Sequence, residues 1–347
     1  MIDNSFWNGK TAIVTGHTGF KGSWLSCILK SLNVNVIGIS DFKRLSDNYK
    51  NLNTKEIFER EENVDIFNDH DKLEMLKFEE VDFVFHFAAQ GIVSIANENP
   101  LETINSNVIG TFNVLNFVNN ISNAKTLIIA TTDKVYLDTD ADNTEESRLG
   151  GKEFYSASKA SSEHIISAFS NTLKRDDLNI GVIRSGNVLG GGDGAKDRIV
   201  TDLINCLKSN TNIYLRNPKS IRPWQYILDS LNGYLLTAQY CTINKQDEVF
   251  NLNSELNNSF NVLDLTNEIL NSWNSKITPQ IIVEDGEFYE TDVLRINSKK
   301  ANKVLKWNAI YTVSDIAGSI VEWYKLSEFE NDVSFKLIDD YYKKLNS

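Results

Sequence analysis

A short apolar run that leads directly into a glycine-rich turn is the feature that most restricts the fold of this chain. Residues Thr11–Thr15 read as a β-strand, and they are followed by Gly16, Gly19 and Gly22 at the spacing GxxGxxG. A helix-like segment, Ser23–Leu32, comes directly afterwards. At the start of such a helix, bare backbone N–H groups can bind a pyrophosphate that a side chain would hold away. The pattern therefore predicts a Rossmann-type dinucleotide-binding turn.

The first half of the chain alternates short β-rich runs with longer helix-like segments. After the first strand, further strands are expected at Val34–Ser40, Glu62–Ile66, Phe83–Phe87, Leu127–Ala130 and Ile180–Ile183. Helices are expected between them, including a long one over Thr103–Asn119. This alternation is typical of βαβ units with right-handed crossovers. We therefore expect an α/β fold built on a doubly wound parallel Rossmann sheet.

The pattern changes after about residue 190. Glycine clusters and irregular polar stretches appear, followed by two helical segments at Val262–Trp273 and Val313–Tyr324. We expect residues 1–186 to form the dinucleotide-binding domain and residues 187–347 to form a smaller, mixed α/β substrate domain. Part of the segment 225–252 is expected to return to the Rossmann sheet.

Bulk properties exclude several classes of partner. The net charge is −12, which argues against nucleic acid or an anionic membrane as the main partner. No basic region followed by an apolar stretch opens the chain, and no apolar run approaches the ~20 residues that span a bilayer, so a cytoplasmic location is expected. The cysteines Cys27, Cys206 and Cys241 are widely separated and the histidines are scattered. We therefore expect neither a disulfide framework nor a metal site.

Acidic residues at strand ends are candidates for binding the adenosine half of a dinucleotide. Asp41 ends the second expected strand, where a carboxylate can accept hydrogen bonds from a ribose 2′-OH and so favours NAD over NADP. Lys43 and Arg44 follow closely and could bind a 2′-phosphate, which leaves NADP open. Asp65 and Ile66, after the third expected strand, suit the edge of the adenine.

Two segments carry groups for hydride-transfer chemistry. The residues Thr131–Lys134 end one expected strand, and Tyr155 and Lys159 share one face at the start of a long helix. An ammonium beside a phenol favours the phenolate, so we expect Lys159 to lower the pKa of Tyr155 towards neutrality. A tyrosine of this kind can remove the proton of a sugar hydroxyl while NAD accepts the hydride from the same carbon.

These segments belong to a resemblance that runs almost from end to end. The chain is similar to CDP-glucose 4,6-dehydratases, which are NAD-dependent nucleotide-sugar dehydratases of the extended short-chain dehydrogenase/reductase superfamily. The segments that carry the likeness are GHTGFKGSW, FHFAAQ, NVIGT, TTDK, YSASK, RSGNVLGGGD, AKDR and LRNPKSIRPWQ. The glycines and YxxxK are typical of the superfamily, whereas residues 133–134, 190–193 and 221–225 are more specific to the dehydratases. The resemblance implies a nucleotide-sugar substrate and a tightly bound NAD that is regenerated in each turnover.

The resemblance also implies roles for the catalytic groups. Removing water across C5 and C6 of a hexose requires a ketone at C4, because the ketone makes the C5 hydrogen acidic. Tyr155 is then the base at the C4 hydroxyl, and Thr132 hydrogen-bonds the C4 oxygen. Lys134, as a neutral amine, is the base at C5, where related thymidine-nucleotide dehydratases carry a glutamate. Asp133 is the acid at the C6 hydroxyl.

Further contacts are carried over from positions in these motifs. Tyr155 and Lys159 are expected to contact the cofactor in addition to their catalytic roles. The other residues expected to bind the cofactor are Gly16, Thr18, Gly19, Phe20, Gly22, Phe87, Ala88, Ala89, Asn107 and Thr131. For the substrate, they are Gln90, Asn187, Arg198, Arg216 and Arg222. The arginines among them offer charged donors for a diphosphate.

Three segments depart from the pattern of the dehydratases. Residues 91–95 lack the usual proline and arginines, residues 137–142 are acidic and shortened, and Gly194 stands where a tryptophan is usual. Two alternatives therefore stay open. One is an NAD-dependent nucleotide-sugar 4-epimerase on the same scaffold, and the other is a nucleotide-sugar-binding homologue without activity.

A homodimer or homotetramer is also expected. The segments Thr103–Asn119 and Tyr155–Ala168 could pair with their copies in a four-helix contact, as is usual in the superfamily. Their apolar stripes, which are Val108, Phe112, Leu115, Ile165 and Phe169, fit such a contact, but packing in the core explains them equally well.

Overall fold

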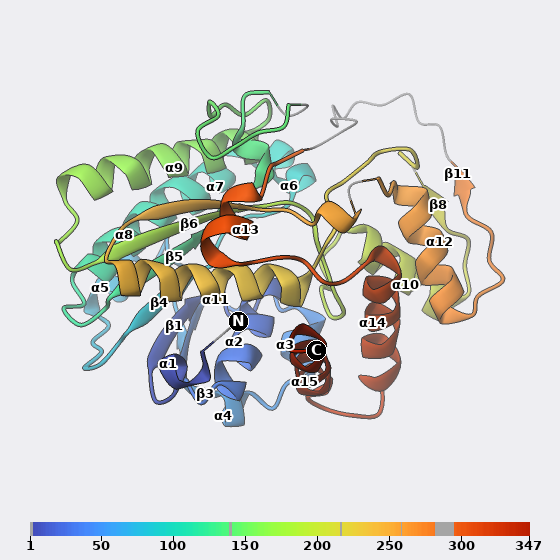
Figure 1. Cartoon of the computed structure of the whole chain (residues 1–347), viewed down its shortest axis with the longest axis horizontal. Coiled ribbons are helices and arrows are strands. Elements are labelled where there is room, and N and C mark those ends of the chain that lie inside the picture. Colours follow the sequence, from blue (N-terminus) through green and yellow to red (C-terminus); the bar gives the residue numbers. More distant parts are fainter. Residues whose placement is uncertain (1–2, 139–140, 216, 258, 282–294) are drawn as a thin grey trace.

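A seven-stranded parallel sheet forms the centre of the computed structural model (Figure 1). The structure describes residues 3–138, 141–215, 217–257, 259–281 and 295–347. In sheet order, the strands are β10 (Glu248–Leu252), β6 (Asn179–Ser185), β5 (Thr126–Ala130), β4 (Phe83–His86), β1 (Thr11–Thr15), β2 (Asn35–Ser40) and β3 (Phe58–Asn63). The order reverses between β4 and β1, and such a switch point is where open α/β sheets bind ligands. The predicted doubly wound fold is confirmed.

Most strands are buried on both faces, as parallel strands usually are. Every residue of β1 is buried, and its alternate side chains enter two different apolar cores. The prediction was wrong for the edge strand β3, which begins and ends earlier than the expected Glu62–Ile66. Its sequence is polar and mostly solvent-facing, while Val64 and Ile66 are buried in the core after the strand has ended. The apolar residues on which the predicted strand was based therefore lie in the loop after β3.

Helices cover both faces of the sheet. The helices α2 (Phe20–Ser31) and α11 (Ile227–Asn244) pack on one face, and α8 (Gly110–Asn119) and α9 (Phe154–Thr172) lie on the other (Figure 1). Trp24 and Leu231 belong to the first core, and Val114 and Ile166 belong to the second. The N-terminal ends of α2 and α9 lie beside the carboxyl ends of β1 and β5, where the site is expected.

The segment Thr103–Asn119 is not one continuous helix. It is divided into α7 (Pro100–Ile104), a π-helical turn η1 (Asn105–Ile109) and α8. In the π-helical turn, the Asn107 side chain accepts a hydrogen bond from the Gln90 N–H at 2.8 Å and donates one to the Gln90 carbonyl at 2.9 Å. Since a buried loop needs partners for its backbone, this turn fixes the chain that leaves β4.

The chain after β6 builds a smaller mixed α/β part beside the strand ends. It contains the helices α10 (Ile199–Ser209), α12 (Val262–Trp273) and α14 (Val313–Leu326), and two short sheets, β7 (Val188–Leu189) with β9 (Gln225–Tyr226) and β8 (Tyr214–Leu215) with β11 (Gln280–Ile281). Within this stretch the chain returns to the large sheet through α11 and β10, which pairs with β6. The shorter elements are α1 (Asn4–Trp7), α3 (Asp47–Asn51), α4 (Thr54–Ile57), α5 (His70–Met75), α6 (Val93–Glu98), η2 (Asp133–Val135), η3 (Glu255–Asn257) and α13 (Lys299–Leu305).

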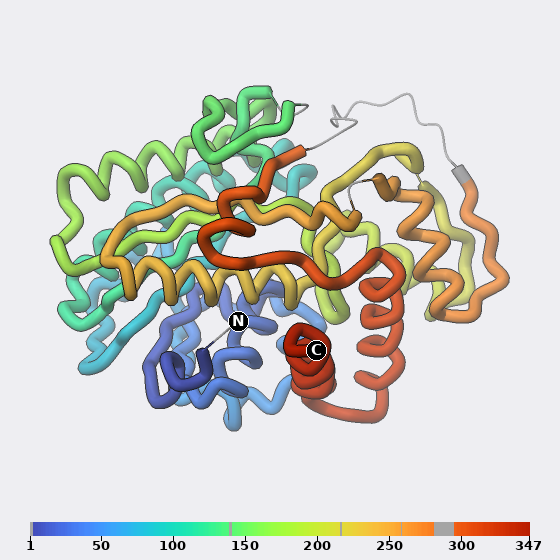
Figure 2. Tube along the Cα trace, in the orientation of Figure 1, coloured from blue at the N-terminus to red at the C-terminus, as the bar shows by residue number. Residues whose placement is uncertain are grey.

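The C-terminal helix α15 (Val333–Leu345) lies against the N-terminal part of the chain (Figure 2). It packs on α2, and Ser334 donates a hydrogen bond to the side chain of Asn48. The Tyr341 hydroxyl donates another to Asp229 in α11, at 3.0 Å. The two ends of the chain are therefore held together. Across the described residues, no helix combines the length and apolarity needed to cross a bilayer.

Candidate active site

A pocket of about 1100 Å³ opens at the carboxyl ends of the central strands. It lies between the glycine turn, the ends of β4, β5 and β6, the start of α9 and parts of the segment 187–224. The predicted site residues that line it are Gly16, Gly19, Phe20, Gly22, Phe87, Ala89, Thr131, Thr132, Asp133, Lys134, Tyr155, Lys159, Asn187, Arg198 and Arg222. Residues from both halves of the sequence therefore meet in one place.

The glycine turn fits a dinucleotide pyrophosphate. Gly16 has a φ of +70°, and a Cβ there would lie 2.6 Å from the Ala88 nitrogen. A Cβ on Gly22 would overlap the Gly16 carbonyl oxygen. The helix α2 follows Gly19 without any side-chain cap, so its first N–H groups remain available at the wall of the pocket.

The start of α9 fixes the position of Tyr155. Glu153 caps this helix, and its carboxylate accepts hydrogen bonds from the N–H groups of Tyr155 at 2.6 Å and Ser156 at 2.9 Å. One turn further on, the buried Lys159 donates a hydrogen bond from Nζ to the Ala130 carbonyl at 3.2 Å. Tyr155 and Lys159, which we call the dyad, are therefore held next to the end of β5.

The charges around the dyad differ from the expectation. Burial raises the pKa of Tyr155, although a hydrogen bond with Thr132 and the charge of Arg198 oppose this. Burial also lowers the pKa of Lys159 to about 8, against the charge of Glu163. The expected lowering of the pKa of Tyr155 by Lys159 is therefore wrong for this structure, because burial outweighs the hydrogen bond with Thr132 and the charge of Arg198.

The segment after β5 presents a carboxyl group that can hold a proton. Asp133 is 4% exposed, and its Oδ1 accepts a hydrogen bond from Thr132 Oγ1 at 3.0 Å. Its Oδ2 is buried with no hydrogen-bond partner among the described residues. Burial raises the pKa of Asp133, although Lys134, Arg222 and Lys21 lie near enough to oppose this. A protonated carboxyl group beside a lysine supplies an acid and a base in one pocket.

A buried ion pair behind the dyad escaped the sequence analysis. Arg184 of β6 donates from Nε to both oxygens of Glu163 of α9, at 2.9 and 3.0 Å. Thr131 Oγ1 donates to the same carboxylate at 2.7 Å, and Arg184 Nη1 donates to the Tyr136 hydroxyl at 2.9 Å. The available signal was an arginine inside an apolar strand together with a glutamate four residues after Lys159.

Two predicted ligands are used inside the protein instead. Gln90, predicted to bind substrate, does not line the pocket, because its side chain bonds the backbone of Ile92 and the hydroxyl of Thr103. Asn107, predicted to bind cofactor, is fully buried and also donates to Ser158 Oγ at 2.9 Å. Both side chains hold the loop after β4 and the start of α9 in place, and their roles as ligands stay predictions.

Three predicted cofactor residues lie just outside the pocket wall. The Thr18 hydroxyl bonds Ser40 Oγ at 2.7 Å and the Arg44 carbonyl at 3.2 Å. The Ile66 side chain is buried in the core below α8, and Ala88 packs against the same core. Their side chains support the site and do not line it. The predicted substrate ligand Arg216 lies outside the described residues.

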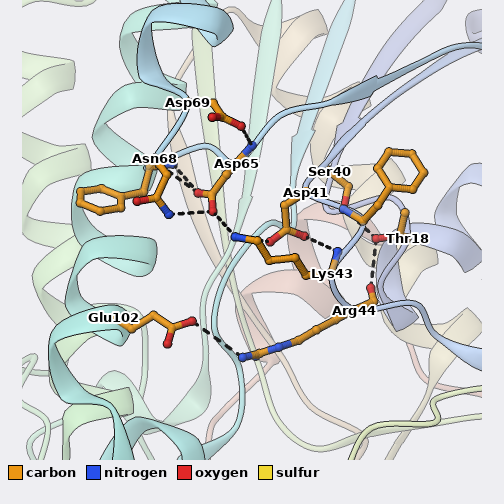
Figure 3. A network of polar contacts seen from close by, with 11 residues as sticks. Thr18, Ser40, Asp41, Lys43, Arg44, Asp65, Asn68, Asp69 and Glu102 are labelled. Atoms are coloured by element: carbon orange, nitrogen blue, oxygen red, sulfur yellow. Dashed lines mark hydrogen bonds and ion pairs between the residues drawn. The ribbon is translucent and has the colours of Figure 1, made fainter.

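The residues predicted to bind the adenosine half of the cofactor form a network of charged side chains (Figure 3). Lys43 Nζ lies 2.9 Å from Asp65 Oδ2 and 3.6 Å from Asp41 Oδ2, so one ammonium bridges both predicted carboxylates. Burial opposes ionisation of Asp65, but hydrogen bonds from Lys43 and Asn68 outweigh it and hold the pKa well below the usual range. Arg44, which lines the pocket, lies 3.9 Å from Glu102 in a weak surface pair.

The comparisons with known proteins agree with this geometry. A model of the GDP-mannose 4,6 dehydratase family matches residues 13–319. The chain belongs to this family. The predictions of a nucleotide-sugar dehydratase and of an enzyme of the hydro-lyase type are confirmed at this level.

Two curated proteins that resemble this chain are a dehydratase and an epimerase. CDP-glucose 4,6-dehydratase from Salmonella typhimurium (strain LT2) is 34% identical, over 94% of this chain and 93% of that protein. UDP-glucose 4-epimerase from Mycoplasma genitalium is 24% identical, over 92% and 97%. The structure of UDP-glucose-4-epimerase from Stenotrophomonas maltophila with bound NAD and formylated UDP-arabinopyranose has a TM-score of 0.79 at 17% identity, and covers 92% of this chain and 99% of that one. This last likeness is one of fold.

Two of the three segments that depart from the dehydratase pattern lie at or next to the pocket. Gly91, Ile92, Val93 and Ser94 line it, and Ser94 Oγ donates a hydrogen bond at 2.8 Å to Asp197, which also lines it. Gly194 has a φ of +70°, and a Cβ there would lie 2.8 Å from the Asp47 carboxylate. A tryptophan at that position would need a different loop. Within residues 137–142, positions 139–140 lie outside the described residues.

Proposed function

We propose that this chain is an NAD-dependent CDP-glucose 4,6-dehydratase that forms CDP-4-keto-6-deoxyglucose. The observation that carries the proposal is the meeting of Tyr155, Asp133 and Lys134 in one pocket, beside a glycine turn suited to a dinucleotide. An epimerase needs the tyrosine but has no use for an acid and a base at C6 and C5. The 34% identical relative named CDP-glucose 4,6-dehydratase supports the same substrate.

The chain's residues divide the proposed reaction among them. Tyr155, hydrogen-bonded by Thr132, takes the proton of the C4 hydroxyl in its ionised form, which burial disfavours and the positive charge of bound NAD would favour. Bound NAD would accept the hydride of C4 and return it to C6, so that it is regenerated. Once C4 is a ketone, Lys134 removes the acidified C5 proton. Asp133, with its raised pKa, then protonates the departing C6 hydroxyl.

Residues from the smaller part would hold the nucleotide sugar. Arg198, Arg222 and Asn187 line the same pocket. Arg222 is 3% exposed, and its Nη1 donates to the Ile221 carbonyl at 2.9 Å. A guanidinium with a fixed orientation can bind a diphosphate through parallel hydrogen bonds. The cytoplasmic location stays a prediction from the sequence.

A homodimer through the helical face of α7, η1 and α9 is the proposed assembly. Leu115 and Phe169 belong to the core, so part of the predicted stripe has an explanation within one chain. Ile104 and Ile109 on the same segment are 38% and 42% exposed. Exposed apolar side chains on neighbouring turns favour a contact with a second copy.

The deciding experiment follows a deuterium label from C4 of CDP-glucose by NMR. The proposal expects a 4-keto-6-deoxy product with the label in its methyl group and no net release of NADH. CDP-, dTDP-, UDP- and GDP-hexoses are assayed side by side to test the nucleotide. A C4 epimer without a methyl group would support the epimerase, and stabilisation by nucleotide sugar without any product would support a binding protein.

A further inference from the structure

Lys21 is a cation in the pocket that has no place in the proposed reaction. It is the second residue of α2, inside the glycine turn, and its side chain lines the pocket. Its Nζ donates a hydrogen bond to Ser185 Oγ at 3.1 Å and lies 5.6 Å from the centre of the Tyr234 ring. Among the described residues, no carboxylate forms an ion pair with it.

The surroundings of this ammonium are mainly cationic. Burial and the charges of Arg198 and Lys159 lower the pKa of Lys21 to about 7, and Asp133 is the acidic group that opposes them. Ser185 and Tyr234, which hold the side chain, are neutral. The protonated form of Lys21 is therefore poorly compensated by the protein, and its charge acts most fully on a bound group at a pH below about 7.

The position of Lys21 points to the reacting end of the cofactor. It stands between the glycine turn and the dyad, and it interacts electrostatically with Lys159 and Asp133. Hydride transfer requires the nicotinamide to touch the carbon whose hydroxyl group Tyr155 deprotonates. Lys21 therefore faces the nicotinamide end, whereas Lys43 lies with Asp41 and Asp65 at the adenosine end (Figure 3).

We propose that Lys21 favours the reduced form of the bound nicotinamide over the oxidised form, and so drives oxidation of the sugar at C4. The inference rests on the proposed NAD-dependent function. The oxidised ring carries a positive charge and the reduced ring is neutral, so a nearby ammonium disfavours only the first. In the step that benefits, the C4–H electron pair moves as hydride to the cofactor, the hydroxyl proton moves to Tyr155, and C4 becomes a ketone.

The test compares binding of NAD and NADH without any substrate. Isothermal titration gives both dissociation constants for the wild type and for Lys21→Met, which keeps the length of the side chain and removes its charge. We expect the wild type to bind NADH more tightly than NAD, and Lys21→Met to reduce this preference roughly tenfold, as one charge at close range in a partly shielded site would. Lys43→Met is the matched control, because the adenosine halves of both cofactors are identical. It changes both affinities by the same factor.

Two outcomes would overturn the inference. If Lys21→Met weakens both cofactors equally, Lys21 is a phosphate anchor and its proposed effect on the nicotinamide is wrong. If the wild type binds neither cofactor, the assignment of NAD falls, and this inference falls with it. Ser185→Ala, which removes the hydroxyl that holds the ammonium, should reduce the preference in the same direction and replaces Lys21→Met if that variant does not fold. An unchanged preference in Ser185→Ala would then count against the inference.

Discussion

At the scale of single residues, Asp133 shows that a group suited to catalysis can weaken the fold. Its pKa is raised by burial, so the folded protein holds this proton more tightly than the unfolded chain does. The free energy of unfolding therefore falls as the pH rises from the unfolded pKa through the folded one, and it stays lower at neutral pH. The cost of burying this carboxyl group is tolerated in the fold for its chemistry.

We predict that Asp133→Asn unfolds at higher urea concentration than the wild type at pH 7. A gain of about 1–3 kcal/mol is expected, because folding of the wild type must either bind a proton or bury a charge at Asp133, and the amide avoids both. The gain should shrink below roughly pH 4, where the unfolded carboxyl is also protonated. A loss of stability at neutral pH would contradict this account, and product formation should fail in the same variant.

Lys134→Met should separate oxidation at C4 from elimination at C5 and C6. We expect formation of the 6-deoxy product to fall by roughly a hundredfold or more, because the base at C5 is removed. NADH absorbance should still appear when CDP-glucose is added, and the C5 proton should no longer exchange with deuterated solvent. The exposed Lys55, which does not line the pocket, serves as the control through Lys55→Met, with near-normal turnover expected. Full turnover by Lys134→Met would remove this residue from the mechanism.

Local motifs made part of the site predictable. Thr132, Asp133 and Lys134 follow a strand directly, and Tyr155 opens a capped helix, so spacing along the chain was enough to bring them to one edge of the sheet. Spacing could not reveal hydrogen-bond partners distant in sequence. Gln90 had the residue type of a ligand, yet its amide bonds Thr103 inside the fold.

At the scale of secondary structure elements, the Arg184–Glu163 pair joins β6 to α9 underneath the dyad. Removal of one partner leaves the other charge buried, which is expected to cost about 3–5 kcal/mol of unfolding free energy. We therefore predict large losses for Glu163→Gln and for Arg184→Met in urea denaturation. The double variant should recover a large part of the loss, and additive losses would contradict a direct pair.

The elements themselves were predictable to different degrees. The strand β1 matches its predicted bounds because it is a short apolar run that ends at a glycine turn, and the helix α12 matches because its apolar residues recur on one face. The strand β3 was misplaced because its own residues are polar. The π-helical turn at Asn105–Ile109 was missed because its cause is the loop at Gln90, which contacts it only in the folded chain.

At the scale of the whole molecule, the exposed isoleucines of α7 and η1 predict the assembly. Light scattering during gel filtration should give the mass of a dimer or tetramer for the wild type. Ile109→Glu should reduce that mass, because a charge would be buried in the apolar contact. Phe329→Glu is the control, since Phe329 is 85% exposed in the turn between α14 and α15. A monomeric wild type would contradict the proposed contact.

The return of the chain to the sheet through α11 and β10 restricts how the two parts of the molecule can move relative to each other. The polypeptide crosses from one half to the other and back before it ends, and α15 then fastens on α2. A movement of one part against the other would therefore have to bend several crossing segments at once and not a single linker. The hydrogen bond from Ser94 in α6 to Asp197 before α10 joins the two parts once more, so such a movement would have to accommodate this contact as well.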